Sequence, residues 1–233
     1  YYMENLNLDG IIATSLENVN YFTNFPAHFF CTDREYNKNP GSSTVYVPQI
    51  YGVLPKESNP ILIVPITGFP TARDNAIKVE QIYVYGQDKP FKTTDSKNTT
   101  LEEDEFEKVL TSVNNTASTP AEALIKVMKD LGLAKANVGI DTENFSPSVD
   151  KAIREELPDL KSGRASELLR FIKMVKTEDE LDMLRKAATI NEKAMTIVFE
   201  HMGPGVTGKQ LFEFYKQAIM KEGGQPRDKI LCA

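Results

Sequence analysis

The first 160 residues contain short apolar segments separated by polar stretches. Each segment is rich in Val, Ile or Tyr and is bounded by Gly, Pro, Asn or Asp, a pattern that is typical of β-strands. The pattern predicts strands at Gly10–Ser15, Thr44–Val47, Ile61–Pro65, Ile82–Gly86 and Asn137–Asp141.

Helix start signals lie among these strands. Thr119 and Glu122 have the spacing of a capping box, and Pro120 occupies the first helical position, so a helix is expected from there to Gly132. Ser146-Pro147 predicts a second helix that runs to Leu157. Strands mixed with helices at this spacing indicate an α/β domain with a mixed sheet.

From Ala165 onward the pattern becomes almost purely helical. Thr177 and Glu180 form a T-x-x-E capping box, which predicts a helix that begins at Glu178 and ends before Gly203–Gly205. Its apolar stripe advances mostly in steps of three and four residues and comprises Leu181, Leu184, Ala188, Met195, Val198 and Met202.

A further helix is predicted between Thr207, which caps it with Gln210, and Gly223-Gly224. Its expected buried side comprises Leu211, Phe212, Tyr215, Ala218 and Ile219. Lys-Ile-Leu-Cys-Ala at 229–233 has the pattern of the start of a strand, which predicts that the second domain is incomplete here.

Charge and composition exclude several classes of protein. The net charge is −6, divided into −9 for residues 1–160 and +3 for residues 161–233. An acidic body without a basic tract argues against nucleic acid, whose phosphates require clustered Lys and Arg. The longest apolar run, Ile61–Ile66, is far too short to span a membrane. Cys31 and Cys232 are the only cysteines, which makes a disulfide scaffold unexpected, and a cytoplasmic location is the default expectation.

A complete active site is not visible in the sequence. The two histidines, His28 and His201, do not form a common zinc-binding motif. Residues 203–208 spell G-x-G-x-x-G, but a dinucleotide site requires a strand before this motif, and here a helix precedes it. We therefore interpret the motif as a helix–helix turn and His201 as a helix-capping or surface residue.

The segment Asn18–Glu35 is the strongest candidate for ligand contact. It holds two pairs of neighbouring aromatic residues without a helical stripe, and core packing with a solvated turn is the alternative interpretation. As a binding loop it would present Phe30 and Arg34 to a ligand, since a guanidinium can bind a carboxylate with two hydrogen bonds.

Three segments resemble the creatinase, Xaa-Pro dipeptidase (prolidase) and aminopeptidase P family. Leu8–Phe25, "LDGIIATSLENVNYFTNF", resembles the opening of its N-terminal domain. Leu168–Met195 resembles the segment that joins this domain to the pita-bread catalytic domain, and Gly203–Leu211 resembles the turn between that domain's first helices. The resemblance implies a creatinase-like N-terminal domain at residues 1–163. It also implies that residues 164–233 form the linker and first two helices of an incomplete α+β pita-bread domain.

The resemblance implies a function for the complete protein, namely metal-dependent hydrolysis of Pro-containing peptides. Members bind two divalent metal ions (Mn, Co or Zn) through two Asp, one His and two Glu that lie downstream of these helices. No catalytic or metal-binding residue is therefore expected within residues 1–233, and the chain alone should be inactive. A homodimer is implied, with His28, Phe30 and Arg34 as candidates for contact with a small peptide substrate. Two departures, Gly208 in place of the usual Glu and a long segment at Cys31–Tyr51, weaken the transfer of substrate contacts.

Two other functions remain open at this point. Creatinase-like members hydrolyse small nitrogen compounds without peptidase metals, and the downstream ligands would distinguish them from peptidases. A non-catalytic dimerisation module is the second alternative. An unfinished sheet would expose a strand edge and uncovered helix stripes, which makes that alternative less favourable.

Overall fold

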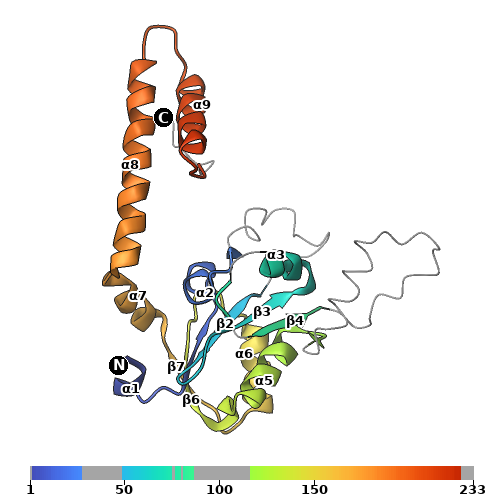
Figure 1. Ribbon diagram of the computed structural model, residues 1–233. Helices are drawn as coiled ribbons and strands as arrows, with labels where there is room; N and C mark the ends of the chain where they lie inside the picture. Colours follow the sequence, from blue (N-terminus) through green and yellow to red (C-terminus); the bar gives the residue numbers. More distant parts are fainter. Residues whose placement is uncertain (1, 28–48, 75–76, 80, 87–115, 227–233) are drawn as a thin grey trace, which may run out of the picture. The chain divides into compact units, whose positions relative to one another are not determined.

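The computed structural model describes residues 2–27, 49–74, 77–79, 81–86 and 116–226. The chain forms two compact units, Tyr1–Phe171 and Ile172–Ala233. We call them the α/β unit and the helical unit (Figure 1).

The α/β unit is built on a mixed sheet. Its described strands are β1 (Gly10–Ala13), β2 (Tyr51–Pro55), β3 (Ile61–Pro65), β4 (Gln81–Tyr85), β5 (Thr116–Ala117), β6 (Asn137–Ile140) and β7 (Lys161–Arg164). They are ordered β5-β4-β3-β2-β1-β6-β7. The β1–β2 and β2–β3 pairs are antiparallel, and the other neighbours are parallel. The predicted α/β class with a mixed sheet is confirmed.

Helices cover both faces of this sheet (Figure 1). The unit contains the helices α1 (Tyr2–Asn5), α2 (Leu16–Thr23), α3 (Phe69–Asp74), α5 (Pro120–Asp130) and α6 (Pro147–Glu156), with 3-10 turns at Ile66–Gly68 and Leu133–Lys135. Helices α5 and α6 pack on one face of the sheet, and α2 and α3 pack on the other.

Strand β3 shows why a continuous apolar run is needed in the middle of the sheet. Its side chains alternate between the two faces, so Ile61 and Ile63 join the core beneath α5 and α6, whereas Leu62 and Val64 join the core beneath α2 and α3. All five residues of the strand are buried. The run Ile61–Pro65 therefore meets two hydrophobic layers.

Several strand predictions are confirmed to within two residues, namely those for β1, β3, β4 and β6. The predicted strand Thr44–Val47 lies outside the described residues. Strands β2, β5 and β7 were not predicted. Strand β2 contains Gly52, a residue that is depleted in strands, which weakened the local strand pattern.

The interpretation of Asn18–Glu35 as a segment without helix is wrong over its first part. Helix α2 occupies Leu16–Thr23, and the Ser15 hydroxyl accepts a hydrogen bond from the Asn18 amide at its start. Asn24 ends the helix in the left-handed conformation at φ 58°. The helix packs on the core through Leu16, Val19 and Phe22, which are three residues apart, and only the last two of these lie within the interpreted segment.

The predicted helices α5 and α6 are confirmed, with one difference at the start of α5. Thr119 accepts a hydrogen bond from the Glu122 amide at 3.2 Å. The Glu122 carboxylate accepts from the Ser118 amide at 2.9 Å rather than from the Thr119 amide that a capping box would use. Gly132 follows at φ 71°, as the predicted helix end requires.

Helix α7 (Ser166–Met174) follows the sheet, and the helical unit contains α8 (Glu178–Glu200) and α9 (Gly208–Lys221). Both predicted capping boxes are complete, that of α8 through Thr177 and Glu180 and that of α9 through Thr207 and Gln210. The G-x-G-x-x-G segment joins the two helices, so its interpretation as a helix–helix turn is confirmed.

The contact between α8 and α9 lies on a face shifted from the predicted stripe, because its α8 residues Ile190, Ala194 and Ile197 are not members of that stripe. Ala194 of α8 packs with Ala218 and Ile219 of α9, and the partly buried residues around them are Ile190, Ile197 and Tyr215. Within the stripe, Val198 is buried, whereas Leu184 is 53% exposed and Met202 is 55% exposed. At the end of α8, the His201 ring stacks on Phe214 with 4.1 Å between ring centroids, and its Nδ1 lies 2.8 Å from the Ile197 carbonyl oxygen.

Candidate functional site

The sequence suggested three residues for ligand contact. His28, Phe30 and Arg34 lie outside the described residues. Among the residues that are described, no group of three or more His, Cys, Asp or Glu side chains is arranged to hold a metal ion. None of the described helices combines the length and apolar character needed to cross a bilayer.

A polar cluster lies at the carboxyl ends of strands β1 and β6, which are parallel neighbours. Such ends are the usual place for ligands in open α/β sheets. Asp141 directly follows β6 and is fully buried. Thr14 and Ser15 follow β1, Asn18 belongs to the first turn of α2, and Ser166 begins α7. We call these five residues the Asp141 cluster.

Five hydrogen bonds converge on the carboxylate of Asp141. Its Oδ2 accepts from the Thr14 amide at 3.3 Å, the Ser15 amide at 2.9 Å and the Asn18 Nδ2 at 2.7 Å. Its Oδ1 accepts from the Glu143 amide at 3.2 Å and the Ser166 hydroxyl at 3.1 Å. Both oxygens are therefore occupied by donors from the protein itself.

These donors also determine the charge of Asp141. Burial penalises the ionised carboxylate and raises its pKa, but the hydrogen bonds, led by that from Asn18, favour the ionised form more strongly. The net effect holds the pKa of Asp141 below its usual value. The group is therefore a buried anion at neutral pH.

Further hydrogen bonds extend the cluster across the two loops. The Thr14 hydroxyl donates to the Asp141 carbonyl oxygen at 2.6 Å and accepts from the Asn144 amide at 3.2 Å. The Ser166 hydroxyl also accepts from the Thr142 amide at 3.0 Å. Segments more than 120 residues apart in the sequence are thus tied to one another.

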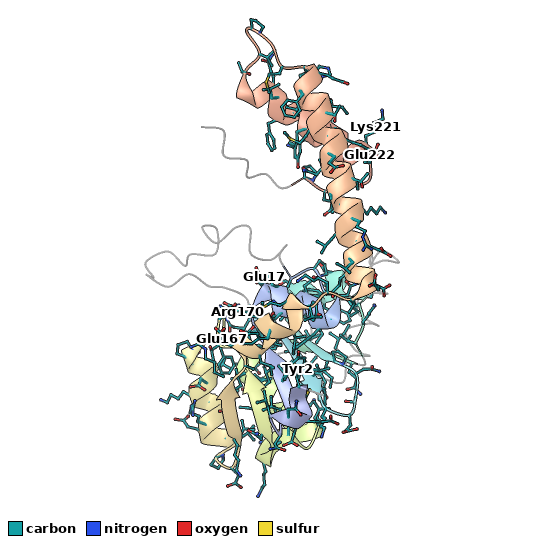
Figure 2. All side chains as sticks on the ribbon, turned by 90° about the vertical axis from the view of Figure 1, so that its left-hand side faces the viewer. Tyr2, Glu17, Glu167, Arg170, Lys221 and Glu222 are labelled. Atoms are coloured by element: carbon teal, nitrogen blue, oxygen red, sulfur yellow. The ribbon has the colours of Figure 1, made fainter. Side chains whose placement is uncertain are left out.

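Helix α7 is attached to the same region by an exposed ion-pair network. Arg170 pairs with Glu143 of the loop after β6. It also binds Glu167, one turn earlier on α7, with 2.6 Å between Nη1 and Oε1; Figure 2 labels both residues of this second pair. Because these side chains are exposed, their attraction is screened by water. The network orients the start of α7 more than it stabilises the fold.

The Asp141 cluster holds the loops after β1 and β6 and the first turns of α2 and α7 together. The described residues contain no buried side-chain nitrogen or oxygen without a hydrogen-bond partner, so the buried polar atoms of the cluster are already bound within the protein. Sequence reasoning missed it because its members are distant in the chain. The available signal was an Asp at the end of one predicted strand and a Thr-Ser-x-x-Asn stretch after another.

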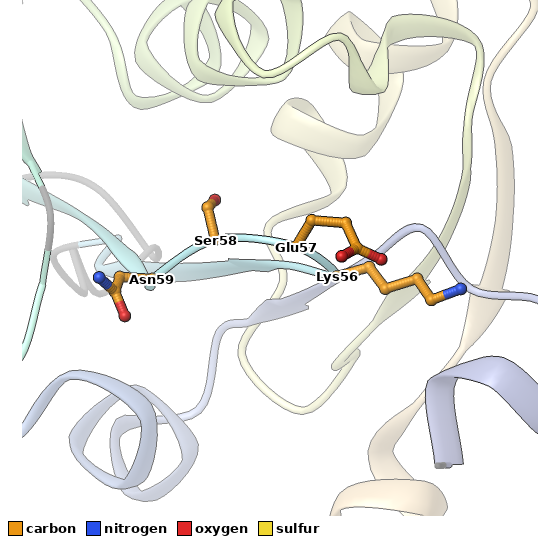
Figure 3. A pocket seen from close by; sticks show the side chains of 4 residues that line it. All are labelled: Lys56, Glu57, Ser58 and Asn59. Carbon is orange, nitrogen blue, oxygen red and sulfur yellow. The ribbon is translucent and has the colours of Figure 1, made fainter.

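A hollow of about 650 Å³ lies at the turn between β2 and β3. The described residues that line it are the four consecutive residues Lys56, Glu57, Ser58 and Asn59. Their side chains point in different directions and do not converge on one point (Figure 3). This surface therefore has no arrangement of groups that would select a ligand.

The comparison with protein families identifies a match over most of the chain. The model of the Creatinase/Prolidase N-terminal domain matches residues 1–175. No curated protein matches the sequence at a significant level.

Solved structures share the fold at low sequence identity. The X-Pro aminopeptidase of Thermotoga maritima is 14% identical with a TM-score of 0.60, and the match covers 95% of this chain and 48% of the other. The Xaa-Pro dipeptidase of Bacillus anthracis is 18% identical with a TM-score of 0.54, covering 94% and 46%. The prolidase of Pyrococcus furiosus is 13% identical with a TM-score of 0.53, covering 95% and 51%.

This chain thus spans about half the length of the solved structures that it matches. The family match extends from the first residue across the whole sheet and into α7, and it agrees with the family suggested by the motifs at Leu8–Phe25 and Leu168–Met195. The chain belongs to the creatinase/prolidase family through its N-terminal domain.

Proposed function

We propose that this chain is the N-terminal portion of a metal-dependent Xaa-Pro peptidase that hydrolyses Pro-containing peptides when complete. The observation that carries the proposal is the family match over residues 1–175, together with a shared fold over 95% of the chain with an X-Pro aminopeptidase. Within this proposal, residues 1–163 form the creatinase-like domain, and residues 164–233 form the linker and first helices of the catalytic domain.

The chemistry in this proposal belongs to the complete enzyme. Two divalent metal ions would generate a hydroxide nucleophile and polarise the scissile carbonyl. Their ligands are expected outside this chain, which alone should be inactive. We also propose a cytoplasmic homodimer acting on small peptides, in which the N-terminal domain shapes access to the substrate site.

The test uses the complete polypeptide that contains this chain. The purified protein is incubated with an Ala-Pro dipeptide and a longer Ala-Pro peptide in the presence of Mn²⁺, and release of free Ala is measured. Release that is abolished by a chelator and restored by Mn²⁺ supports the proposal. Hydrolysis of creatine without added metal would instead identify a creatinase-like hydrolase, and the absence of both activities would favour a non-catalytic module.

A separate experiment tests the candidates His28, Phe30 and Arg34, which rest on the sequence alone. Replacing Arg34 by Ala in the complete enzyme should raise the KM for a short peptide. Lys56→Ala on the exposed β2–β3 turn removes the same charge and should leave the KM unchanged. An unchanged KM in the Arg34 variant would exclude that residue from substrate binding.

A further inference from the structure

Among the described strands, β7 is an edge of the sheet, and some of its backbone groups pair with none of them. It pairs with β6 on one side, and all four of its residues, Lys161–Arg164, are exposed. The Lys161 amide donates to Ala136 O at 3.0 Å, and the Ala165 amide donates to Ile140 O at 2.8 Å. Because backbone groups alternate along a strand, those of Ser162 and Arg164 point away from β6. They are available to another strand.

A groove lies beside this edge, between β7 and helix α6. It consists of two adjoining hollows of about 410 and 210 Å³, which share Ile140, Asp150, Arg154 and Ser162. Its lining includes apolar residues in both hollows, among them Phe145 in the larger and Leu157 in the smaller. A strand edge next to a helix-walled groove is the arrangement by which several domains bind extended peptides.

The charges of the groove select the kind of peptide. Asp150 neutralises Arg154, with 2.9 Å between Oδ2 and Nε. Arg164 also lines the groove, and within the described part of the chain it has no ion-pair partner. The groove thus carries one uncompensated cation next to outward-facing backbone groups. An acidic side chain on an added strand would pair with it.

A second copy of the chain fits this edge less well than an acidic peptide. If two β7 strands paired antiparallel so that Ser162 of each faced Arg164 of the other, the two Arg164 side chains would lie two positions apart on one face. Diagonal neighbours on one face of paired strands are within reach of long side chains, so two arginines there would repel each other, whereas an acidic side chain would attract Arg164. Charge therefore favours a different partner.

We propose that β7 and the adjoining α6–β7 groove bind an extended segment of a partner protein that carries an acidic side chain. The segment adds a strand to the sheet by pairing with the outward backbone groups of Ser162 and Arg164. Its acidic side chain binds Arg164, and its apolar neighbours enter the groove. This interaction goes beyond the proposed peptidase function, and its test needs no enzymatic activity.

The probe is a fluorescently labelled, C-terminally amidated peptide, Thr-Val-Thr-Glu-Thr-Val, in which Val, Glu and Val share one face. Fluorescence anisotropy with the purified protein should detect saturable binding. The same peptide with Gln in place of Glu should bind about threefold more weakly or worse, as expected for loss of an exposed ion pair. Arg164→Gln should weaken binding of the Glu peptide to the same extent. It should leave the affinity for the Gln peptide unchanged.

Backbone pairing is tested by a proline substitution with a matched control. Ser162→Pro removes an outward amide and leaves the β6 ladder intact, because the Ser162 amide does not face β6. It should lower the affinity for both peptides by about tenfold. The Ser162→Ala variant should bind both peptides with unchanged affinity. Lys161→Gln, which removes a charge from the opposite face of the strand, should also bind normally. Circular dichroism confirms that each variant is folded.

Three results would overturn the proposal. Absence of saturable binding at millimolar peptide would mean that Lys161 and Arg164 only protect the edge from pairing. Equal binding of the Glu and Gln peptides would remove Arg164 from the interaction. Dimerisation of the protein that Ser162→Pro abolishes would assign the edge to a second copy of the chain.

Discussion

Removing the charge of Asp141 should destabilise the α/β unit substantially. Asp141→Asn keeps the size of the side chain but replaces one acceptor oxygen by an NH₂ group. The remaining oxygen can still serve the three donors from Thr14, Ser15 and Asn18. The NH₂ group would then face the Glu143 amide and the Ser166 hydroxyl.

The cost follows from these contacts. The Ser166 hydroxyl can rotate and accept, but the Glu143 amide loses its partner, which costs about 1–2 kcal/mol. The other bonds lose the strengthening that an ionised acceptor provides, which adds about 1 kcal/mol. We therefore expect the free energy of unfolding to fall by about 2–3 kcal/mol at pH 7. Urea unfolding followed by far-UV circular dichroism measures it.

The pH dependence gives a second, independent readout. The pKa of Asp141 is lower in the folded protein than in the unfolded chain, so its contribution is complete above the unfolded value near 4. The contribution disappears as the pH falls through the folded pKa. The difference in stability between the wild type and Asp141→Asn should therefore be constant from pH 7 to about pH 5 and should shrink below about pH 4.

The matched control is Asp159→Asn. Asp159 pairs with Lys135 at 3.0 Å, but both side chains are more than 60% exposed. Loss of this ion pair should lower the free energy of unfolding by less than about 0.5 kcal/mol. A stability of Asp141→Asn equal to that of the control, or a difference from the wild type that persists unchanged at pH 3, would refute the assignment of Asp141 as a buried, hydrogen-bonded anion.

Three further predictions concern other parts of the fold. Burial and the hydrogen bond from its hydroxyl to Asp130 raise the pKa of Tyr83 to about 12, so Asp130→Asn should lower the pKa in a 295 nm titration. Gly139→Ala should destabilise the α/β unit by about 1–3 kcal/mol because a Cβ there would meet a neighbouring side chain at 2.8 Å, whereas Gly163→Ala meets nothing within 4 Å and should be neutral in thermal melts. Thr177→Ala should cost about 1 kcal/mol by removing the cap of α8, and Thr177→Ser should restore most of it in urea unfolding.

The features that the sequence predicted correctly depend on neighbouring residues. The capping boxes of α8 and α9 involve residues three positions apart, and both formed as expected. Strand β3 was recognisable because five consecutive apolar residues would be unfavourable in contact with water and therefore indicate a buried segment. In each case the physical cause lies within one short segment.

The features that were missed depend on contacts between distant segments. Strand β7 has the sequence Lys-Ser-Gly-Arg and no buried residue, so only its pairing with β6 makes it a strand. Helix α2 has a buried Asn18 because Asp141, 123 residues away, accepts its side-chain hydrogen bond. A single sequence carries no local signal for either pairing.

The Asp141 cluster also bears on how this domain can contribute to function. Open α/β sheets commonly bind ligands where the strands end in loops, because backbone amides and helix starts are available there. In this chain the amides of Thr14 and Ser15 and the first turn of α2 are directed at an internal carboxylate. That anion occupies the position at which a bound anion would otherwise use them. The described carboxyl ends of β1 and β6 therefore serve to hold loops and helices together, and the binding that we propose for the α/β unit uses a different place, the edge of β7 with its outward backbone groups.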